Sequence, residues 1–150
     1  MRVSKTDYPT AYQTTLMVKD ACLCLHAQRA ARVLARRFDV ALRSTGLTSG
    51  QFSLMNGLNR PEPPPLGAVA DLLAMDRTTV TANLKPLVRR GLATLDVDTS
   101  DRRVRRAGLT DEGRAVLAAA TVIWRKEHGA LEAELGAAGP RLRQDLRSVA

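Results

Sequence analysis

The sequence has very few aromatic residues and only two cysteines. Phe, Trp and Tyr together make up 3% of the chain, so the core must be built from Leu, Ala and Val, a composition that favours helices over a β-sandwich. Cys22 and Cys24 lie two apart in a segment with helical spacing, where they point to different faces and do not easily bridge each other. A hydrophobic content of 45% over 150 residues is enough for one compact domain without disulfides or metals.

Sequence signals of catalysis, membrane insertion and export are also missing. No Gly-rich phosphate loop, H-E-x-x-H or G-x-S-x-G motif occurs, and the chain has only two histidines, which argues against an enzyme, a cofactor and a metal centre. No apolar run reaches the length of a membrane span, and no apolar stretch follows a basic start. We therefore expect a cytoplasmic protein that is not an enzyme and has no membrane partner.

Positive charge is what the sequence has in excess. Lys and Arg number 23 against 15 Asp and Glu, a formal net charge of +8. Such an excess favours a polyanionic partner, because Lys and Arg that bind phosphates release counterions. The alternative is a basic surface that only keeps the protein in solution, and the positions of the charges along the chain decide between the two.

The spacing of apolar residues predicts a mostly helical fold. These residues recur every three or four positions from Lys19 to Ser44, which predicts one long amphipathic helix with Gly46 as its C-cap. Residues 1 to about 15 show no such period and are expected to form a loose arm. Thr48 or Ser49 is expected to cap the shorter helix that follows.

Two further helices, joined by a tight turn, are predicted between Leu66 and Gly91. The first carries apolar residues from Leu66 to Leu73, and the second begins after Asp76, a good N-cap residue. Gly91 lies where a left-handed residue is expected to end the second helix. Two helices joined in this way form a helix-turn-helix.

The second of these helices has a polar and basic face opposite its apolar side. Val80, Leu84 and Leu87 are expected to be buried, which leaves the opposite face free to enter a major groove. Threonine hydroxyls and lysine amines can contact phosphates and base edges there. The candidate DNA-binding residues of this helix are Arg77, Thr78, Thr79, Thr81, Lys85 and Arg89.

After this helix the period changes to the alternation of a strand. Ala93 to Val97 alternates, the turn-forming residues Asp98 to Asp101 follow, and Val104 to Leu109 can return antiparallel. The resulting hairpin is basic, and narrow minor grooves attract guanidinium groups. Its candidate DNA-binding residues are Arg102, Arg103 and Arg105.

Charge and motif point to the same region. Between Arg77 and Arg106 lie eight basic and three acidic residues, a net charge of +5 and more than half of the excess. A solvated face would not need this concentration on one helix and the adjoining hairpin. Thr110 is then expected to cap a last long helix, with an apolar stripe from Leu117 to Leu135, and a short terminal helix follows a break at residues 136–140.

Several strings of residues resemble the MarR (multiple antibiotic resistance regulator) family of winged-helix regulators. Residues 98–103, Asp-Thr-Ser-Asp-Arg-Arg, with residues 108–114, Gly-Leu-Thr-Asp-Glu-Gly-Arg, are similar to the family's D-x-x-D-R-R wing leading into L-T-x-x-G-R. Gly46-Leu47-Thr48 with Gln51-Phe52, and Thr78-Thr79-Val80-Thr81 with Gly91-Leu92, are independent matches. The resemblance covers nearly all the chain from about Cys22 onward.

The resemblance implies a winged helix-turn-helix on a helical dimerisation scaffold. Residues 48–109 would form the DNA-binding lobe, and residues 15–45 and 110–150 the dimerisation helices of the same domain. The two recognition helices of the homodimer would enter successive major grooves of a pseudo-palindromic site, with half-sites about 34–36 Å apart. By the same resemblance, Asp101 would be the structural acid of the wing and pair with an arginine.

The resemblance assigns DNA contacts to individual residues, and at one position this sequence differs from the family. Thr78, Thr79 and Thr81 would contact bases or phosphates, and Arg102 and Arg103 the minor groove or phosphates. Position 82 is Ala, where many relatives carry an arginine that contacts bases, so sequence readout would fall to Lys85 or to groove shape.

The resemblance favours a repressor that leaves its operator when a small apolar or aromatic effector binds between the DNA-binding lobe and the dimerisation helices. One alternative is a thiol-based redox sensor, because Cys22 resembles the reactive cysteine of a peroxide-sensing branch, although that branch's tyrosines are replaced by Arg36 and Leu47. Another is an interaction module that binds an acidic partner.

Overall fold

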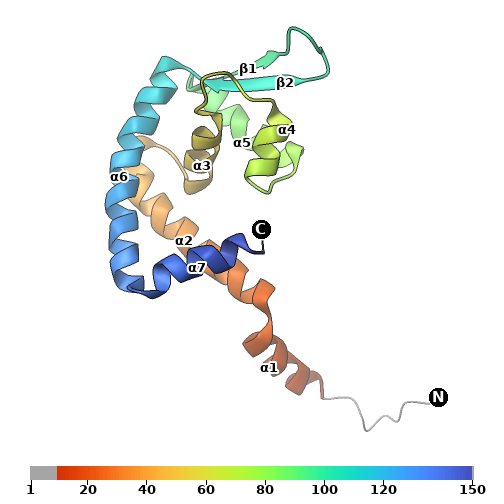
Figure 1. Cartoon of the computed structure of the whole chain (residues 1–150), viewed down its shortest axis with the longest axis vertical. Helices are drawn as coiled ribbons and strands as arrows, with labels where there is room; N and C mark the ends of the chain where they lie inside the picture. The colour runs from red at the N-terminus through yellow and green to blue at the C-terminus, as the bar shows by residue number, and fades with distance from the viewer. Residues whose placement is uncertain (1–9, 150) are drawn as a thin grey trace, which may run out of the picture. The chain divides into compact units, whose positions relative to one another are not determined.

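The computed structural model describes residues 10–149 and divides them into two units, residues 10–36 and residues 37–149 (Figure 1). These residues form seven α-helices and one antiparallel hairpin, which confirms the predicted mostly helical fold. No helix in this part of the chain is both long and apolar enough to cross a membrane. The order is α1 (Ala11–Ala21), α2 (Leu23–Leu42), a 3-10 turn (Arg43–Thr45), α3 (Ser49–Leu58), α4 (Leu66–Leu72), α5 (Arg77–Arg89), β1 (Ala93–Val97), β2 (Arg105–Leu109), α6 (Asp111–Leu135) and α7 (Ala138–Arg147).

The predicted N-terminal arm is wrong for residues 11–15, which are helical, while residues 1–9 lie outside the described residues. The reason is a capping box that sequence reasoning overlooked. The Gln13 N–H donates to the Thr10 hydroxyl at 3.2 Å, and the Thr10 N–H donates to the Gln13 side chain at 2.8 Å. These two bonds satisfy free N–H groups of the first turn and begin α1 at Ala11.

The long helix predicted from Lys19 to Ser44 is confirmed over Leu23–Leu42, but it is not continuous from Lys19, because the backbone is extended at Cys22, with φ −76° and ψ 104°. Cys22 ends α1 by donating its N–H to the Val18 carbonyl, and its Sγ accepts the Leu25 N–H at 3.4 Å. Cys22 thus acts as a cap on both sides of the break. No proline or glycine marks this position in the sequence.

The second unit confirms the predicted local signals around α3. Gly46 ends the 3-10 turn in the left-handed region, at φ +67°. Thr48 is the N-cap of α3 and forms a capping box with Gln51, in which the Gln51 N–H donates to the Thr48 hydroxyl at 3.2 Å.

The helix-turn-helix consists of α4 and α5, as predicted. Asp76 caps α5, and Gly91 follows the helix at φ +71°. The side chains of Val80, Leu84 and Leu87 are 0% exposed, because α5 packs against α3 and α4. The core around them is apolar and contains Leu42, Leu47, Phe52, Leu54, Met55, Leu58, Leu66, Val69, Ala70, Leu92, Ala93, Ala107, Leu109, Leu117 and Ala120.

The hairpin lies above α3, α4 and α5 in Figure 1 and closes the core. β1 and β2 pair in register from Ala93 opposite Leu109 to Val97 opposite Arg105. The segment before α4 is hydrogen-bonded to β2, since the Ala107 N–H donates to the Pro64 carbonyl at 3.1 Å. This bond joins the hairpin to the helix-turn-helix.

The long helix α6 starts at the end of the hairpin and contacts α3 (Figure 1). Thr110 is its N-cap, as predicted; its hydroxyl accepts the Gly113 N–H at 3.0 Å and donates to the Gly91 carbonyl at 2.6 Å. The end of α2 is tied to α6 by Arg37, which donates to both carboxylate oxygens of Glu134 at 2.7 and 2.8 Å and also pairs with Glu127. These bonds raise the pKa of Arg37 further above its ordinary value.

Two glycines of α6 give a matched test of this packing. A Cβ on Gly113 would lie 1.9 Å from the Leu92 carbonyl oxygen, whereas a Cβ on Gly129 would meet nothing within 4 Å. We expect Gly113→Ala to lower the free energy of unfolding by about 1–3 kcal/mol, because two backbones must separate. Gly129→Ala should raise it by about 0.5–1 kcal/mol, because alanine favours the helix. Urea unfolding of both variants measures the difference, and equal effects would contradict the close contact between α6 and Leu92.

Candidate nucleic-acid interface

The outer face of α5 is solvent-exposed from its first turn. Asp76 accepts the Thr79 N–H at 2.8 Å and the Thr79 hydroxyl at 2.6 Å. Both bonds, with that from the hydroxyl first, lower the pKa of Asp76 and keep it charged. The Thr79 hydroxyl hydrogen is therefore committed to the cap, and Thr79 can offer a partner only its lone pairs.

A shallow hollow of about 300 Å³ runs along this face, lined by Arg77, Thr78, Thr81, Ala82 and Lys85. Thr81 is half-buried and donates its hydroxyl to the Arg77 carbonyl at 2.8 Å, while Thr78 and Lys85 are exposed. Ala82 leaves the middle of the hollow open. The hollow can accept a group from a partner, with Lys85 at one end.

Arg89 lies apart from the other candidates of α5. It is exposed beside Val88 and lines a separate, mostly apolar hollow that reaches Leu95 of β1. Lys85 contributes to both hollows. The candidates on α5 therefore form a strip along the helix with Lys85 between its two parts.

The hairpin and α5 meet in a third hollow of about 450 Å³, which also reaches the start of α4. Arg77 and Thr81 of α5 line it together with Arg103 and Arg105 of the hairpin. Arg102 is exposed on the loop and does not line this hollow. Four candidates from separate parts of the sequence thus face one space, with three guanidinium groups among them.

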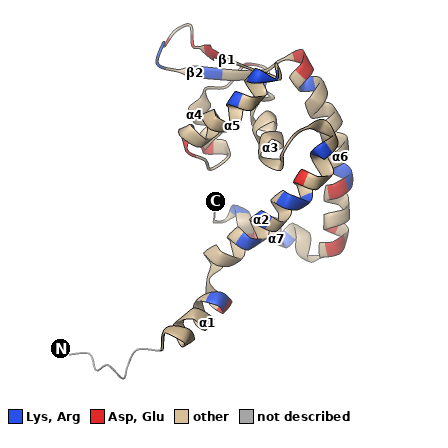
Figure 2. Cartoon of the chain, turned by 180° about the vertical axis from the view of Figure 1, so that it is seen from behind, with Lys and Arg blue, Asp and Glu red and all other residues tan. Residues whose placement is uncertain are grey.

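Other basic residues lie elsewhere on the molecule, on α2 and α7 (Figure 2). Two of the eight in the cluster between Arg77 and Arg106 are bound within the fold. Arg90 donates to the Gly46 carbonyl at 2.7 Å, and Arg106 pairs with Asp98 and donates to the Pro63 carbonyl at 3.0 Å. The remaining six basic residues of the cluster all belong to the predicted site.

The wing loop is organised by Asp98, which is 8% exposed and is the one buried charged side chain among the described residues. One of its carboxylate oxygens accepts the Ser100 N–H at 2.8 Å, the Ser100 hydroxyl at 2.6 Å and the Asp101 N–H at 2.9 Å. The other oxygen binds Arg106. Through Arg106 the loop is attached to Pro63, in the segment before α4.

Asp101 was expected to be the structural acid of the wing, and this expectation is corrected in part. Asp101 pairs with an arginine, as predicted: Arg103 donates its Nε at 3.2 Å. The Asp101 side chain is 42% exposed and that of Arg103 is 91% exposed, so this pair contributes little to stability and leaves Arg103 free to turn to a phosphate. The acid that holds the loop is Asp98. Its place at the start of the Asp-Thr-Ser-Asp turn is a sequence signal for this role that the sequence analysis missed.

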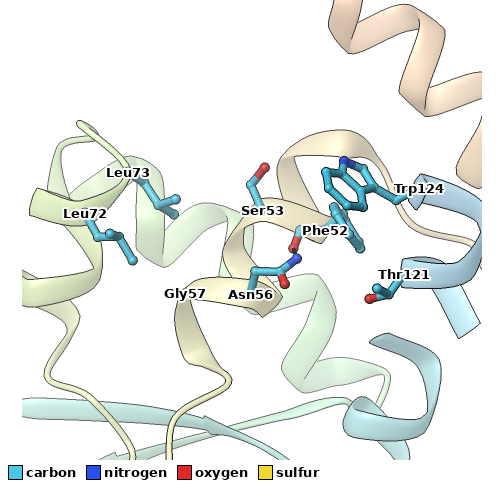
Figure 3. Close-up of a pocket in the computed structure, with 8 residues that line it drawn as sticks. All are labelled: Phe52, Ser53, Asn56, Gly57, Leu72, Leu73, Thr121 and Trp124. Carbon is cyan, nitrogen blue, oxygen red and sulfur yellow. Dashed lines mark hydrogen bonds between the residues drawn. The ribbon is translucent and has the colours of Figure 1, made fainter. Parts of the chain in front are cut away.

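A cavity of about 400 Å³ lies on the other side of α3, between α3, α4 and α6 (Figure 3). Trp124, the only tryptophan of the chain, stacks on Phe52 with ring centroids 6.2 Å apart and on His128 at 4.7 Å. Sequence reasoning expected a ligand between the lobe and the dimerisation helices but did not name the residues. The lining residues are Phe52, Ser53, Asn56, Gly57, Leu72, Leu73, Thr121 and Trp124.

The cysteines lie in the N-terminal unit. Cys22 is half-buried at the break between α1 and α2, and exposed Cys24 accepts a hydrogen bond from the Gln28 side chain at 3.1 Å. Within residues 10–149, no three His, Cys, Asp or Glu side chains gather as metal ligands would.

No family model matches the chain, and no curated protein does. Among solved structures, the chain is similar to the M. tuberculosis transcriptional regulator MosR in complex with DNA, at 35% identity and a TM-score of 0.78, over 85% of this chain and 92% of that one. The PcaV transcriptional regulator of Streptomyces coelicolor, in complex with its natural ligand, matches at 27% identity and a TM-score of 0.70, over 85% and 93%. A MarR-family transcriptional regulator from Rhodococcus matches at 20% identity and a TM-score of 0.72, over 94% of each chain, and shares the fold.

The charge of Asp98 gives the wing a dependence on pH. The Ser100 hydroxyl, Arg106 and two backbone N–H groups hold the pKa of Asp98 well below its ordinary value. Because the folded pKa is below the unfolded one, this carboxylate stabilises the fold above about pH 4, and the contribution is lost as the pH falls further. We expect Asp98→Asn to be less stable than the parent at neutral pH, with a difference that shrinks in acid.

Hydrogen exchange at the Ser100 and Asp101 amides, with urea unfolding across this pH range, measures the effect. Asp96→Asn, which removes an exposed carboxylate from β1 of the same hairpin, is the control. The same pH dependence in both variants would show that Asp98 has no special part in holding the loop.

Proposed function

Because the chain belongs to the MarR family of winged helix-turn-helix transcription regulators, we propose that it binds double-stranded DNA as a homodimer and represses transcription until a small effector releases it. The regulators of this family are not enzymes, which agrees with the sequence. The observation that carries the proposal is the surface at which Arg77 and Thr81 of α5 share a hollow with Arg103 and Arg105 of the hairpin. A recognition helix and a basic wing held side by side can contact two grooves of one duplex.

In this proposal α5 enters the major groove with its exposed face. Thr78 and Lys85 are free to reach base edges or phosphates, and Thr79 and Thr81 can accept hydrogen bonds through their committed hydroxyls. The open space at Ala82 leaves readout to Lys85 and to groove shape. Arg89 lies further along the helix and suits a phosphate rather than a base.

The wing supplies the second contact. Arg102 and Arg103 are exposed on a loop that Asp98 holds in place, so they can enter the minor groove without first ordering the backbone. When Arg103 turns toward Arg77 and Arg105 instead, the three surround the hollow beside the wing, which suits one backbone phosphate. The MosR structure contains DNA, which supports the assignment by similarity.

A second copy of the chain is the proposed partner of the terminal helices, residues 15–45 and 110–150. No residue of α1 is buried, although Tyr12 and Met17 are large and apolar. In the second unit, Leu142 and Leu146 of α7 are also exposed. Exposed apolar side chains in such numbers mark a surface that another protein covers.

The cavity between α3, α4 and α6 is the proposed effector site. It lies between α3 and α4 of the DNA-binding lobe, residues 48–109, and α6, whose Trp124 stacks on Phe52 of α3 (Figure 3). A ligand wedged there would bind best to one spacing of α5 relative to α6, and so would shift the dimer toward or away from the spacing of the half-sites. PcaV was solved in complex with its natural ligand, which supports the proposal that this chain binds an effector.

Oxidation of Cys22 is a second proposed trigger for release of the dimer from DNA. Cys22 caps both sides of the break between α1 and α2, so a change at its sulfur would disturb the start of α2. Cys22→Ser is expected to abolish release by peroxide if this device operates. Release that persists in the variant would exclude it.

The proposal of sequence-specific binding is tested by selecting duplexes from a random pool at moderate salt. We expect enrichment of a pseudo-palindrome with half-sites about one helical turn apart. Binding without sequence preference, or binding to acidic proteins in place of duplexes, would favour the interaction module instead.

Removing the wing arginines should weaken binding to every sequence. We expect the Arg102→Ala/Arg103→Ala double variant to bind at least about tenfold more weakly, with the slope of log K against log salt flattened by about 0.9 for each phosphate that is no longer bound. The matched control is Arg125→Ala/Lys126→Ala, which removes two exposed charges from α6. Titrations of a selected duplex at several salt concentrations measure the affinity and the salt slope of both double variants. Equal effects in the two would show that the wing arginines contribute only through the net charge of the protein.

Lys85→Ala should change the sequence preference of DNA binding, in contrast to the wing variant, because Lys85 lines the hollow that Ala82 leaves open. If Lys85 contacts a guanine edge, the variant loses about 1–3 kcal/mol on the preferred sequence and much less on sequences changed at that base pair. Affinities for a panel of single-base variants of the selected duplex measure this. A uniform loss across the panel would assign Lys85 to a phosphate.

A further inference from the structure

The C-terminal end of α5 is bonded to a distant part of the chain through Arg90, the C-cap residue of the helix. The Arg90 side chain reaches the 3-10 turn that follows α2, where its Nη1 donates to the Gly46 carbonyl at 2.7 Å. Its Nη2 donates to the Thr45 carbonyl at 3.4 Å. Among the described residues, no other hydrogen bond joins α5 or its cap to α2 or to this turn. Arg90 is therefore their one direct polar link in this part of the chain.

Gly46 makes room for the guanidinium group. A Cβ at this position would lie 3.1 Å from Nη2 of Arg90, which is closer than most side-chain contacts, and the backbone is left-handed there. Carbonyls at the end of a helical turn have no N–H partner in that turn, and they carry the negative end of its dipole. The positive charge of Arg90 thus lies at the C-terminal ends of two helical segments at once.

The same end of α5 is also bonded to the start of α6. The Thr110 hydroxyl donates to the Gly91 carbonyl at 2.6 Å, and the Thr110 N–H donates to the Leu92 carbonyl at 3.2 Å. Further along, Arg37 binds the end of α2 to Glu134 of α6. The end of α5 is therefore bonded to two helices, α2 and α6, that are themselves bonded to each other.

These bonds act on the direction of α5, whereas its buried apolar side fixes its rotation about its own axis. The helix has 13 residues and is about 20 Å long, so a tilt of a few degrees at its C-terminal end moves its first turn by about 1–2 Å. Neighbouring base pairs are only about 3.4 Å apart along the duplex. Small tilts of α5 therefore matter for whether two recognition helices fit two half-sites at once.

We propose that Arg90 is a positioning residue, which sets the direction of α5 relative to the end of α2 and thereby the half-site spacing that the dimer accepts. This inference rests on the proposed function. Arg90 makes no contact with DNA, because its guanidinium is used by the Thr45 and Gly46 carbonyls. Without this link α5 keeps its polar face outward but tilts more freely. A wrong spacing then costs less binding free energy, and the right spacing gains less.

Arg90→Met tests the proposal, because it removes the donors and keeps most of the length of the side chain. Arg90 is exposed, so the variant should still fold. The probes are a selected duplex and versions with one or two base pairs added or removed between its half-sites. Each base pair moves one half-site by about 3.4 Å and turns it by about 35°. We expect the ratio of affinities, preferred over shifted spacing, to fall about fivefold to tenfold.

Two further variants separate positioning from charge and from stability. Arg60→Met removes the same charge from an exposed site between α3 and α4 and should leave the ratio unchanged. Arg90→Lys keeps the charge and can reach one carbonyl but not both, so it should recover part of the ratio. A loss of folded protein alone lowers binding to every duplex by the same factor and leaves the ratio as it was. Equal ratios in Arg90→Met and the parent, or equal falls in Arg90→Met and Arg60→Met, would overturn the inference.

Amide hydrogen exchange of the free protein measures the link without DNA. Arg90→Met should speed exchange in residues 43–49 and 88–92, and Arg60→Met should speed it in neither. Unchanged exchange in both segments would overturn the inference. A parent that binds all spacings equally would contradict the proposed dimer on DNA, and the inference with it. A parent that discriminates between spacings, with an Arg90→Met variant that discriminates equally well, would overturn the inference alone.

Discussion

Burial of one side of α5 is the constraint on which the interface depends. Val80, Leu84 and Leu87 repeat at helical spacing and are completely enclosed by the helices around them. Burial of each such side chain contributes about 1.5–3 kcal/mol, so no other rotation of α5 about its axis competes. Thr78 and Lys85 therefore point outward because the apolar residues on the opposite side of α5 are buried. No contact made by the polar residues themselves is needed. A polar strip can remain free for a partner only because the opposite side of the helix is fixed.

The wing is positioned by a different kind of interaction. Its loop is folded around the carboxylate of Asp98, and Arg106 carries this arrangement to the segment that precedes α4. Polar bonds of this kind are directional, so they fix the path of a loop that is too short to have a core of its own. The two parts of the interface meet where Arg77 of α5 faces Arg103 and Arg105 of the hairpin. Since the helix depends on apolar packing and the wing on a buried carboxylate, changes can weaken one without displacing the other.

The sequence predicts those features that local rules determine, and it fails where distant residues decide. Asp76 and Thr110 cap their helices as expected, because an N-cap depends on residues two or three positions away. The break at Cys22 carries no proline or glycine, so the apolar period ran through it unnoticed. The family pattern places two acids in the wing, but only the fold shows that Asp98, and not Asp101, turns inward. The residues of the cavity were not predicted because its walls combine α3 and α4 with α6, which comes much later in the sequence.

In the proposed complex, α5 and the wing contact one duplex at the same time. Amide hydrogen exchange of the protein with and without a selected duplex measures both contacts in one experiment. Exchange should slow in both residues 77–85 and residues 98–105, whereas residues 125–133, in the middle of α6, should remain unchanged. Protection confined to the terminal helices, or protection of residues 98–105 with none in residues 77–85, would contradict this complex.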